Sequence, residues 1–271
     1  VTFHSLAVRL IGATTGRKPS ICDNSLLAKI YESLISTPGF LASINHYILE
    51  LMSMMKDEHQ YKDSKQYFAD RKKYGIKALF KDMDGHTIYT RSEQERRICN
   101  FLHCHGIKFR YEAPYPYSTA TYNYRQYKPD FTIYYTVNGE TKVLYLEHFA
   151  VDAQGKVPPF FQERGSWFEA NRKYNEGIVW KRNLHQQHRT SLIETTSAMF
   201  NDGTWKDRLT KQLRCYGIPV KPIPDEQIYA DAVRSRHQME DNLISLISSF
   251  INLMKSNFLS LPDIKRQAES K

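Results

Sequence analysis

Two strand-like segments separated only by Asn138 and Gly139 restrict the fold of this chain more than any other feature. Residues 128–137 and 140–151 have the pattern of β-strands. Asn-Gly is the preferred pair for a two-residue type I′ turn, in which both central residues need a positive φ. The sequence therefore predicts an antiparallel hairpin with a two-residue loop.

The predicted turn also fixes which residues of the hairpin face each other. If Asn138 and Gly139 form the loop, Val137 faces Glu140, and in the same register Asp130 faces Glu147. Opposed residues have Cβ atoms about 4.5–5.5 Å apart on one face of the sheet, so these carboxylates repel each other unless a cation lies between them. Such oxygen ligands suit Mg²⁺ or Mn²⁺. The alternatives are a surface pair that tolerates the repulsion, or a β-bulge that breaks the register.

The segments around the hairpin predict a unit of mixed helix and strand. Ser92 and Glu95 have the capping-box spacing, which predicts a helix from residue 92 to about Gly106. Residues 107–113 alternate apolar and polar side chains, as a strand requires. After the hairpin we expect a helical region over 159–188, a strand over 189–200, and a short helix from Trp205. The predicted order is αβββαβ, followed by that short helix, in an α+β fold.

Both ends of the chain have helical patterns. Residues 26–35 and 40–55 place apolar side chains three and four positions apart, residues 238–259 are strongly amphipathic, and Pro262 predicts a helix stop. Residues 56–75 are charged and typical of a linker. We therefore expect an α+β unit inserted into an all-helical subdomain formed by both chain ends, with the segments 1–90, 91–222 and 223–271.

The composition limits the partners and the compartment. The net charge of +9 favours a polyanion such as DNA. Cys22, Cys99, Cys104 and Cys215 are too few and too scattered for a disulfide framework, which predicts a reducing cytoplasm. No stretch approaches the roughly 18 apolar residues of a membrane span, so we expect no membrane partner. Because the first residue is Val, we expect the chain to be a piece of a longer protein.

Residues 127–131, with the letters YKPDF, and the later Leu146-Glu147-His148 resemble the signature of PD-(D/E)xK nucleases. The predicted order of elements is similar to their restriction-endonuclease-like core. The resemblance implies that Asp130 and Glu147 hold a metal and that Glu95 is an additional acidic residue beside it, with Glu112 as a weaker candidate.

The chain departs from this signature two residues after Glu147, where Phe149 replaces the lysine. The resemblance implies that Lys181 of the following helix supplies that amine, which orients the attacking water and offsets charge developing on the phosphate. The other interpretation of Lys181 is solvent exposure on a basic helix.

A second resemblance covers the chain ends. Residues 2–20 and 245–260 resemble parts of superfamily 1 helicases of the UvrD/Rep type, the second of them the 1B subdomain. In some helicase IV-like relatives a nuclease-like unit interrupts that region. Its short sequence motifs are similar to residues 111–115, 128–131, 146–149 and 180–185 of this chain. This resemblance implies a partner in cis, the remainder of the parent helicase. Gly12 to Lys18 lack the phosphate-loop spacing, so ATP hydrolysis is expected outside this chain.

Four further residues are candidates for contact with nucleic acid. Arg125 and Lys128 lie in or beside the tyrosine-rich segment 115–127, where stacking faces and positive charge combine as in single-strand binders. Arg182 and His185 lie on the predicted basic helix. The competing interpretations are a packed hairpin extension for the tyrosine segment and a solvated face for the helix.

These patterns together predict a divalent-metal-dependent DNA phosphodiester cleavage module of a superfamily 1 DNA helicase. One alternative is a catalytically inactive nuclease-fold clamp that binds DNA for the helicase, in which Phe149 reports lost chemistry. A weaker alternative is an insert that recruits protein partners.

Overall fold

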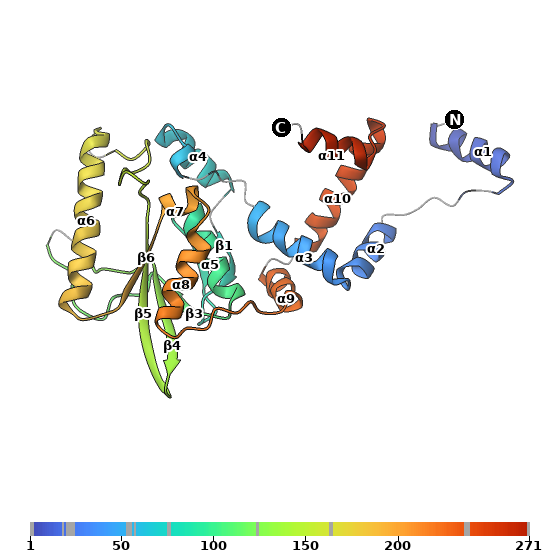
Figure 1. The fold of residues 1–271 in the computed structure, drawn as a ribbon. Helices are drawn as coiled ribbons and strands as arrows, with labels where there is room; N and C mark the ends of the chain where they lie inside the picture. Colours follow the sequence, from blue (N-terminus) through green and yellow to red (C-terminus); the bar gives the residue numbers. More distant parts are fainter. Residues whose placement is uncertain are drawn as a thin grey trace. The chain divides into compact units, whose positions relative to one another are not determined.

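The computed structural model describes residues 3–17, 19, 25–52, 56, 58–74, 77–122, 125–162, 165–235 and 239–269. The chain divides into two compact units, one from residues 1–41 with 238–271 and one from residues 42–237. Helices and strands are both present, so the fold is of the mixed α+β type (Figure 1). Among the described residues, no helix is both long enough and apolar enough to cross a membrane.

The first unit is built from helices of both chain ends. Its elements are α1 (Phe3–Thr15), α2 (Ser25–Ile35), the start of α3 (Pro38–His46), α10 (Met239–Ser256) and α11 (Leu261–Glu269). Helices α2 and α10 contact each other, and Tyr31 and Leu243 are buried, one on each of these two helices. Apolar side chains such as Leu10 and Leu253 remain exposed.

The second unit contains both sheets and the remaining helices. After α3 its elements are η1 (Tyr47–Leu51), η2 (Glu58–Gln60), α4 (Ser64–Tyr74), β1 (Lys77–Lys81), β2 (Thr87–Tyr89), α5 (Glu93–Cys104), β3 (Lys108–Tyr111), β4 (Phe131–Val137), β5 (Glu140–Phe149), α6 (Trp167–Gln187), β6 (Leu192–Thr196), α7 (Ser197–Asn201), α8 (Trp205–Cys215) and α9 (Asp225–Ser235). The predicted order αβββαβ corresponds to α5, β3, β4, β5, α6 and β6.

The four-stranded sheet has the order β3-β4-β5-β6. β3, β4 and β5 pair antiparallel, whereas β6 runs parallel to β5. The parallel pair needs a crossover, and α6 supplies it between β5 and β6. β4 and β5 are therefore the two central strands.

The strand alternation separates two faces of this sheet. Ile133, Leu144 and Leu146 join Ile98 of α5 and Leu209 of α8 in the main core cluster. Even and odd positions of β5 point to opposite faces, so Tyr145, Glu147 and Phe149 point away from that cluster. The second face is covered by α6, and Figure 1 shows α6 on one side of the sheet with α5 and α8 on the other.

The hairpin has the predicted register. Val137 pairs with Glu140 and Phe131 pairs with Leu146, and the pairing between them has no bulge. Asn138 and Gly139 have φ values of 53° and 82°, as a type I′ turn requires. The local sequence was therefore sufficient to place every residue of these two strands on its face.

The helix cap at Ser92 is also confirmed. The Ser92 hydroxyl accepts a hydrogen bond from the backbone N–H of Glu95 at 3.0 Å, and α5 begins at Glu93. The following strand is shorter than predicted, because Glu112 has a φ of 49° and the extended backbone ends at Tyr111.

The prediction that residues 1–90 are helical is wrong for residues 77–89, which form the hairpin of β1 and β2. Ala78, Leu79 and Phe80 are all buried, so β1 lacks the alternation that would have revealed it. β1 contacts α5 and α9, and the compact units accordingly divide at residues 41 and 238 rather than near 90 and 223.

Residues 56–75 are not a linker throughout, because they contain α4. Tyr61 and Tyr67 in this segment are buried with Phe160 in a small aromatic cluster. The many charged residues of this segment led to the linker prediction, although a few of its aromatic side chains are buried.

Three other boundaries differ from those predicted. Helix α6 begins at Trp167 instead of residue 159, and β6 covers only Leu192–Thr196 before α7 begins. Pro262 lies in the first turn of α11 and does not end a helix. Proline is tolerated there because the first backbone N–H groups of a helix have no partner within it.

Candidate functional site

Asp130 lies directly before β4, at the end of the hairpin away from the turn. The residue is only 7% exposed, and its Oδ2 accepts a hydrogen bond from the backbone N–H of His148 at 2.7 Å. This bond holds the Asp130 carboxylate at the end of β5, beside the position of Glu147. The pairing of β4 with β5 extends to Phe131 and Leu146, one position before Asp130 and Glu147.

Glu147 is fully buried in a central strand. Its Oε1 accepts a hydrogen bond from the Tyr127 hydroxyl at 2.5 Å, and its Oε2 lies 2.5 Å from Nζ of Lys181. Burial and the nearby charge of Asp130 raise the pKa of Glu147 from 4.5 to about 8. A carboxyl with this pKa is a poor anion on its own, and binding of a cation would favour its ionised form.

Lys181 reaches Glu147 from α6, across the face of the sheet. Its Nζ lies 5.5 Å from the ring centroid of Phe149 and 5.8 Å from that of Tyr127. Burial lowers the pKa of Lys181, but the charges of Glu147 and Asp130 outweigh burial and raise it. Lys181 is therefore ion-paired at the carboxylates, and the interpretation as a freely solvated helix residue is wrong.

Glu95 lies in the first turn of α5 and is 6% exposed. Its Oε2 accepts hydrogen bonds from the Tyr111 hydroxyl at 2.5 Å and from the backbone N–H of Arg91 at 3.0 Å. Burial and the charge of Asp130 raise the pKa of Glu95 to about 7. Glu95 therefore lies within electrostatic reach of Asp130.

Glu112, the weaker acidic candidate, has a different role in the structure. Its carboxylate forms an ion pair with Arg91, and its backbone N–H donates to the carbonyl of Asp130 at 3.0 Å. Burial lowers the pKa of Arg91, but Glu112 and Asp130 outweigh it and raise the pKa. Glu112 thus holds a positive charge next to the carboxylates of Glu95 and Asp130.

A chain of hydrogen bonds connects Glu147 through Tyr127 and His185 to Thr190. The Tyr127 hydroxyl lies 3.1 Å from Nε2 of His185, and Nδ1 of His185 lies 2.7 Å from Oγ1 of Thr190. The Tyr115 hydroxyl lies 2.6 Å from the same Thr190 oxygen. When Glu147 is ionised, Tyr127 donates its single proton to the carboxylate, so Nε2 of His185 is the donor to Tyr127.

His185 was predicted on a solvated, DNA-contacting face, and this prediction is wrong. The side chain is buried at 2% exposure, and burial lowers its pKa to about 4. A neutral, buried imidazole cannot pair with a phosphate from solution. The side chain points to Tyr127 because helical periodicity places residue 185 on the sheet side of α6 together with Lys181, four residues earlier.

The other three predicted DNA contacts lie on the surface. Arg125 and Lys128 are exposed. Arg182 is exposed as well, and its guanidinium forms two hydrogen bonds with Glu194, at 2.7 and 2.6 Å. Arg182 would have to give up this pairing in order to bind a phosphate.

The tyrosine-rich segment 115–127 packs without forming a hairpin extension in its described part. Tyr115 and Tyr127 are buried, and the Gln126 amide donates to the carbonyls of Tyr115 and Tyr117 at 2.9 Å each. Tyr122 is fully exposed. Residues 123 and 124 of the predicted segment lie outside the described residues.

A cavity of about 770 Å³ opens beside the carboxylates. Glu95, Asp130 and Lys181 line it on the side of the sheet. The remaining walls come from α4, from α6 and from the segment that precedes α6. A ligand in this cavity would therefore meet Glu95, Asp130 and Lys181 together, whereas Glu147 lies behind Lys181 and does not line the cavity.

The donor set suits a divalent cation. Mg²⁺ and Mn²⁺ take carboxylate oxygens and usually keep water and substrate phosphate as further ligands, so that one or two carboxylates suffice. Asp130 and Glu147 are both buried and within electrostatic reach of each other, and Lys181 offsets their charge only in part, since the pKa of Glu147 stays raised. Asp130 and Glu147 are the residues that would hold the ion.

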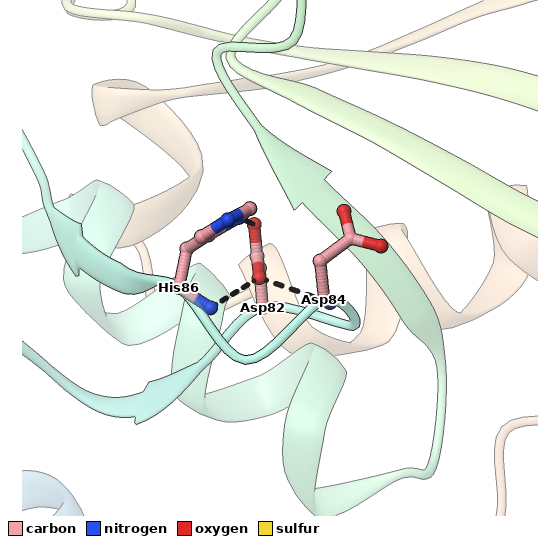
Figure 2. Close-up of side chains that lie close together, drawn as sticks. All are labelled: Asp82, Asp84 and His86. Atoms are coloured by element: carbon pink, nitrogen blue, oxygen red, sulfur yellow. Dashed lines mark hydrogen bonds and ion pairs between the residues drawn. The ribbon is translucent and has the colours of Figure 1, made fainter.

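A second acidic group has the tighter spacing but a structural explanation. Within the described part of the chain, the group of three potential ligands whose atoms all lie within 4.8 Å of one another is Asp82, Asp84 and His86 (Figure 2). Oδ1 of Asp82 accepts from the backbone N–H groups of Asp84 and His86, at 3.0 and 2.8 Å. Asp84 pairs with Arg110. These bonds are those of a side chain closing the β1–β2 turn.

Comparisons with protein-family models, with curated proteins and with solved structures found no match for this chain. The case for a function therefore rests on the residues and geometry described above.

Several residues at the site had no signal in the sequence. Tyr111 was predicted only as a strand residue, and Tyr127 only as part of the YKPDF segment, yet each donates to a buried carboxylate. Arg91 directly precedes the predicted helix cap, which was the one clue to its position. Phe68 and Phe160 of the cavity walls lie in segments that were interpreted as linker or helix.

Proposed function

We propose that this chain contains a divalent-metal-dependent DNA phosphodiester cleavage module with a restriction-endonuclease-like core, which serves a superfamily 1 DNA helicase in cis. The observation that carries the proposal is the meeting of Asp130, Glu147 and Lys181 at one end of β5. Glu147 and Lys181 come from different elements and are in direct contact.

The arrangement of elements also supports the proposal. The hairpin β4–β5 supplies both carboxylates, α5 supplies Glu95, and α6 supplies the lysine that the position of Phe149 lacks. A lysine on the helix compensates for Phe149 because the two positions approach the same carboxylate. This favours an active module over the inactive clamp.

The residues of the chain divide the chemistry of phosphodiester hydrolysis between them. A bound Mg²⁺ or Mn²⁺ supplies Lewis-acid activation of the phosphate and of a water molecule. Lys181 can shift from Glu147 toward a substrate phosphate and offset its developing negative charge. Tyr127 and His185 hold Glu147 in place, and Tyr111 holds Glu95.

The proposal is tested by cleavage of end-labelled DNA with Mg²⁺ or Mn²⁺. We expect Glu147→Gln and Asp130→Asn to lower the cleavage rate on the order of 10²-fold or more, because each removes a charge that holds the metal. Both changes preserve side-chain shape, and the amide oxygen that Asp130→Asn introduces can still accept from the backbone N–H of His148. The matched control is Glu140→Gln, an exposed glutamate on the same strand beside the turn.

Equal cleavage by the wild type and Glu147→Gln would contradict the proposed site. Salt-sensitive DNA binding without cleavage under either metal would instead identify the chain as the inactive clamp.

A further inference from the structure

The cavity beside the carboxylates has a wall of aromatic rings. We call Tyr67, Phe68, Phe160, Phe161 and Tyr174 the aromatic wall, and all five line the cavity. Their rings contact one another in sequence: Phe68 with Tyr67 at 5.3 Å, Tyr67 with Phe160 at 4.3 Å, Phe160 with Phe161 at 5.0 Å and Phe161 with Tyr174 at 5.8 Å between centroids. The wall is thus continuous from α4 to α6.

Burial in the core accounts for Tyr67 and Phe160 of the aromatic wall, but not for Phe68 at its end. Tyr67 and Phe160 are buried at 6% exposure each and belong to a core cluster. Phe68 is 58% exposed. A phenyl ring left in water gives up the stabilisation that burial provides, so Phe68 has a face available for a ligand in the cavity.

Positive side chains also line this cavity. Arg71 on α4, Arg91 before α5, and Lys173 and Lys181 on α6 contribute to the lining. They lie on elements from several sides of the space. Glu95 and Asp130 are the acidic lining residues, and two of the four cations, Arg91 and Lys181, are ion-paired with Glu112 and Glu147.

This combination has a recognisable chemistry. Proteins that bind single-stranded nucleic acid pair aromatic faces for the bases with cations that follow the phosphates. A volume of about 770 Å³ is within the range of pockets that hold small molecules, and so suits a nucleotide rather than paired and stacked bases.

We propose that the cavity binds one unstacked nucleotide of single-stranded DNA, with its base on Phe68 and its phosphate held by Arg71. The inference rests on the proposed function and specifies its substrate: the strand enters unpaired, and its backbone reaches Asp130 and Lys181. A duplex would have to open before it could bind in the same way.

Fluorescence anisotropy with a labelled single strand of about 16 nucleotides, in EDTA so that no cleavage occurs, tests this inference. We expect wild type to bind the single strand more tightly than a blunt duplex of the same sequence. Phe68→Ala should weaken single-strand binding about tenfold, the effect of losing one stacked base. Phe168→Ala is the matched control, because Phe168 is 68% exposed and does not line the cavity.

A second variant tests the electrostatic half of the inference. Arg71→Met keeps an unbranched aliphatic side chain, and we expect it to weaken binding and to lower the slope of log affinity against log salt by roughly 0.7, as for one phosphate contact to a single strand. Unchanged binding by both Phe68→Ala and Arg71→Met, or equal affinity for duplex and single strand, would overturn the inference.

The results also separate this inference from the proposed function. If wild type cleaves DNA but Phe68→Ala and Arg71→Met both bind strands as wild type does, the cavity inference fails and the cleavage proposal stands. If Phe68→Ala loses strand binding but wild type never cleaves, the cleavage proposal fails and the strand-binding cavity remains.

Discussion

Lys181 is the residue whose position matters most for the proposed chemistry. Its ammonium lies 2.5 Å from Glu147 and above the ring of Phe149. In the nuclease signature the lysine two residues after the acidic residue belongs to the strand, whereas Lys181 belongs to α6. The amine arrives at the same carboxylate by either route, because α6 packs on the face of the sheet to which Glu147 points.

We expect Lys181→Met to lower kcat for DNA cleavage roughly 10²–10³-fold, the effect of losing one preorganised electrostatic contact in the transition state. The affinity for Mn²⁺, measured by calorimetry, should not weaken, since the amine is no metal ligand. Lys211→Met on the exposed face of α8 is the control. Loss of Mn²⁺ binding in Lys181→Met would show that the lysine acts by holding the carboxylates in place.

At the scale of elements, the β4–β5 hairpin determines the position of the acidic pair. Its turn uses two residues with positive φ, and the paired residues follow without a bulge. A shift of one residue would move Glu147 to the other face of the sheet, into the apolar core, and would move Leu146 out of that core. The turn is therefore expected to matter for the site as well as for stability.

Two glycine substitutions should have opposite effects. Gly139→Ala has open space around the added Cβ but keeps a φ of 82°, so we expect a cost of about 1–2 kcal/mol in the free energy of unfolding. Gly177→Ala, in the middle of α6 and also in open space, should stabilise by about 0.5–1 kcal/mol. Urea denaturation measures both, and a Gly139→Ala protein as stable as wild type would contradict the turn assignment.

At the scale of the whole molecule, the buried acidic residues couple stability to pH. In the folded protein the pKa of Glu147 is raised to about 8 and that of Glu95 to about 7, from an ordinary 4.5. At a pH between the ordinary pKa of 4.5 and these raised values, the folded state holds protons that the unfolded state has released. Stability therefore falls as the pH rises through this range. A bound divalent cation would reverse this trend by stabilising the ionised carboxylates.

We therefore expect the unfolding temperature in EDTA to fall from about pH 5 to about pH 8, by about 2–4 °C for each kcal/mol lost. Glu147→Gln should flatten this dependence, because Gln does not titrate. Added Mg²⁺ should raise the unfolding temperature more at the upper end of the range than at the lower. The same pH dependence in wild type and Glu147→Gln would show that titration of Glu147 is not the cause.

The sequence by itself determined the features that depend on neighbours along the chain. The Asn138-Gly139 turn, the pairing of β4 with β5 from Val137 and Glu140 to Phe131 and Leu146, and the cap at Ser92 all follow from local backbone geometry and strand alternation. These interactions form between residues whose separation is fixed by the chain itself.

Only the tertiary structure decided which distant side chains complete the site. The contact of Lys181 with Glu147, the burial of His185 and the aromatic wall that α4 brings to the cavity depend on how α4 and α6 pack in the second unit. Packing joins residues through shape and burial, and neither is encoded in the spacing of any short segment.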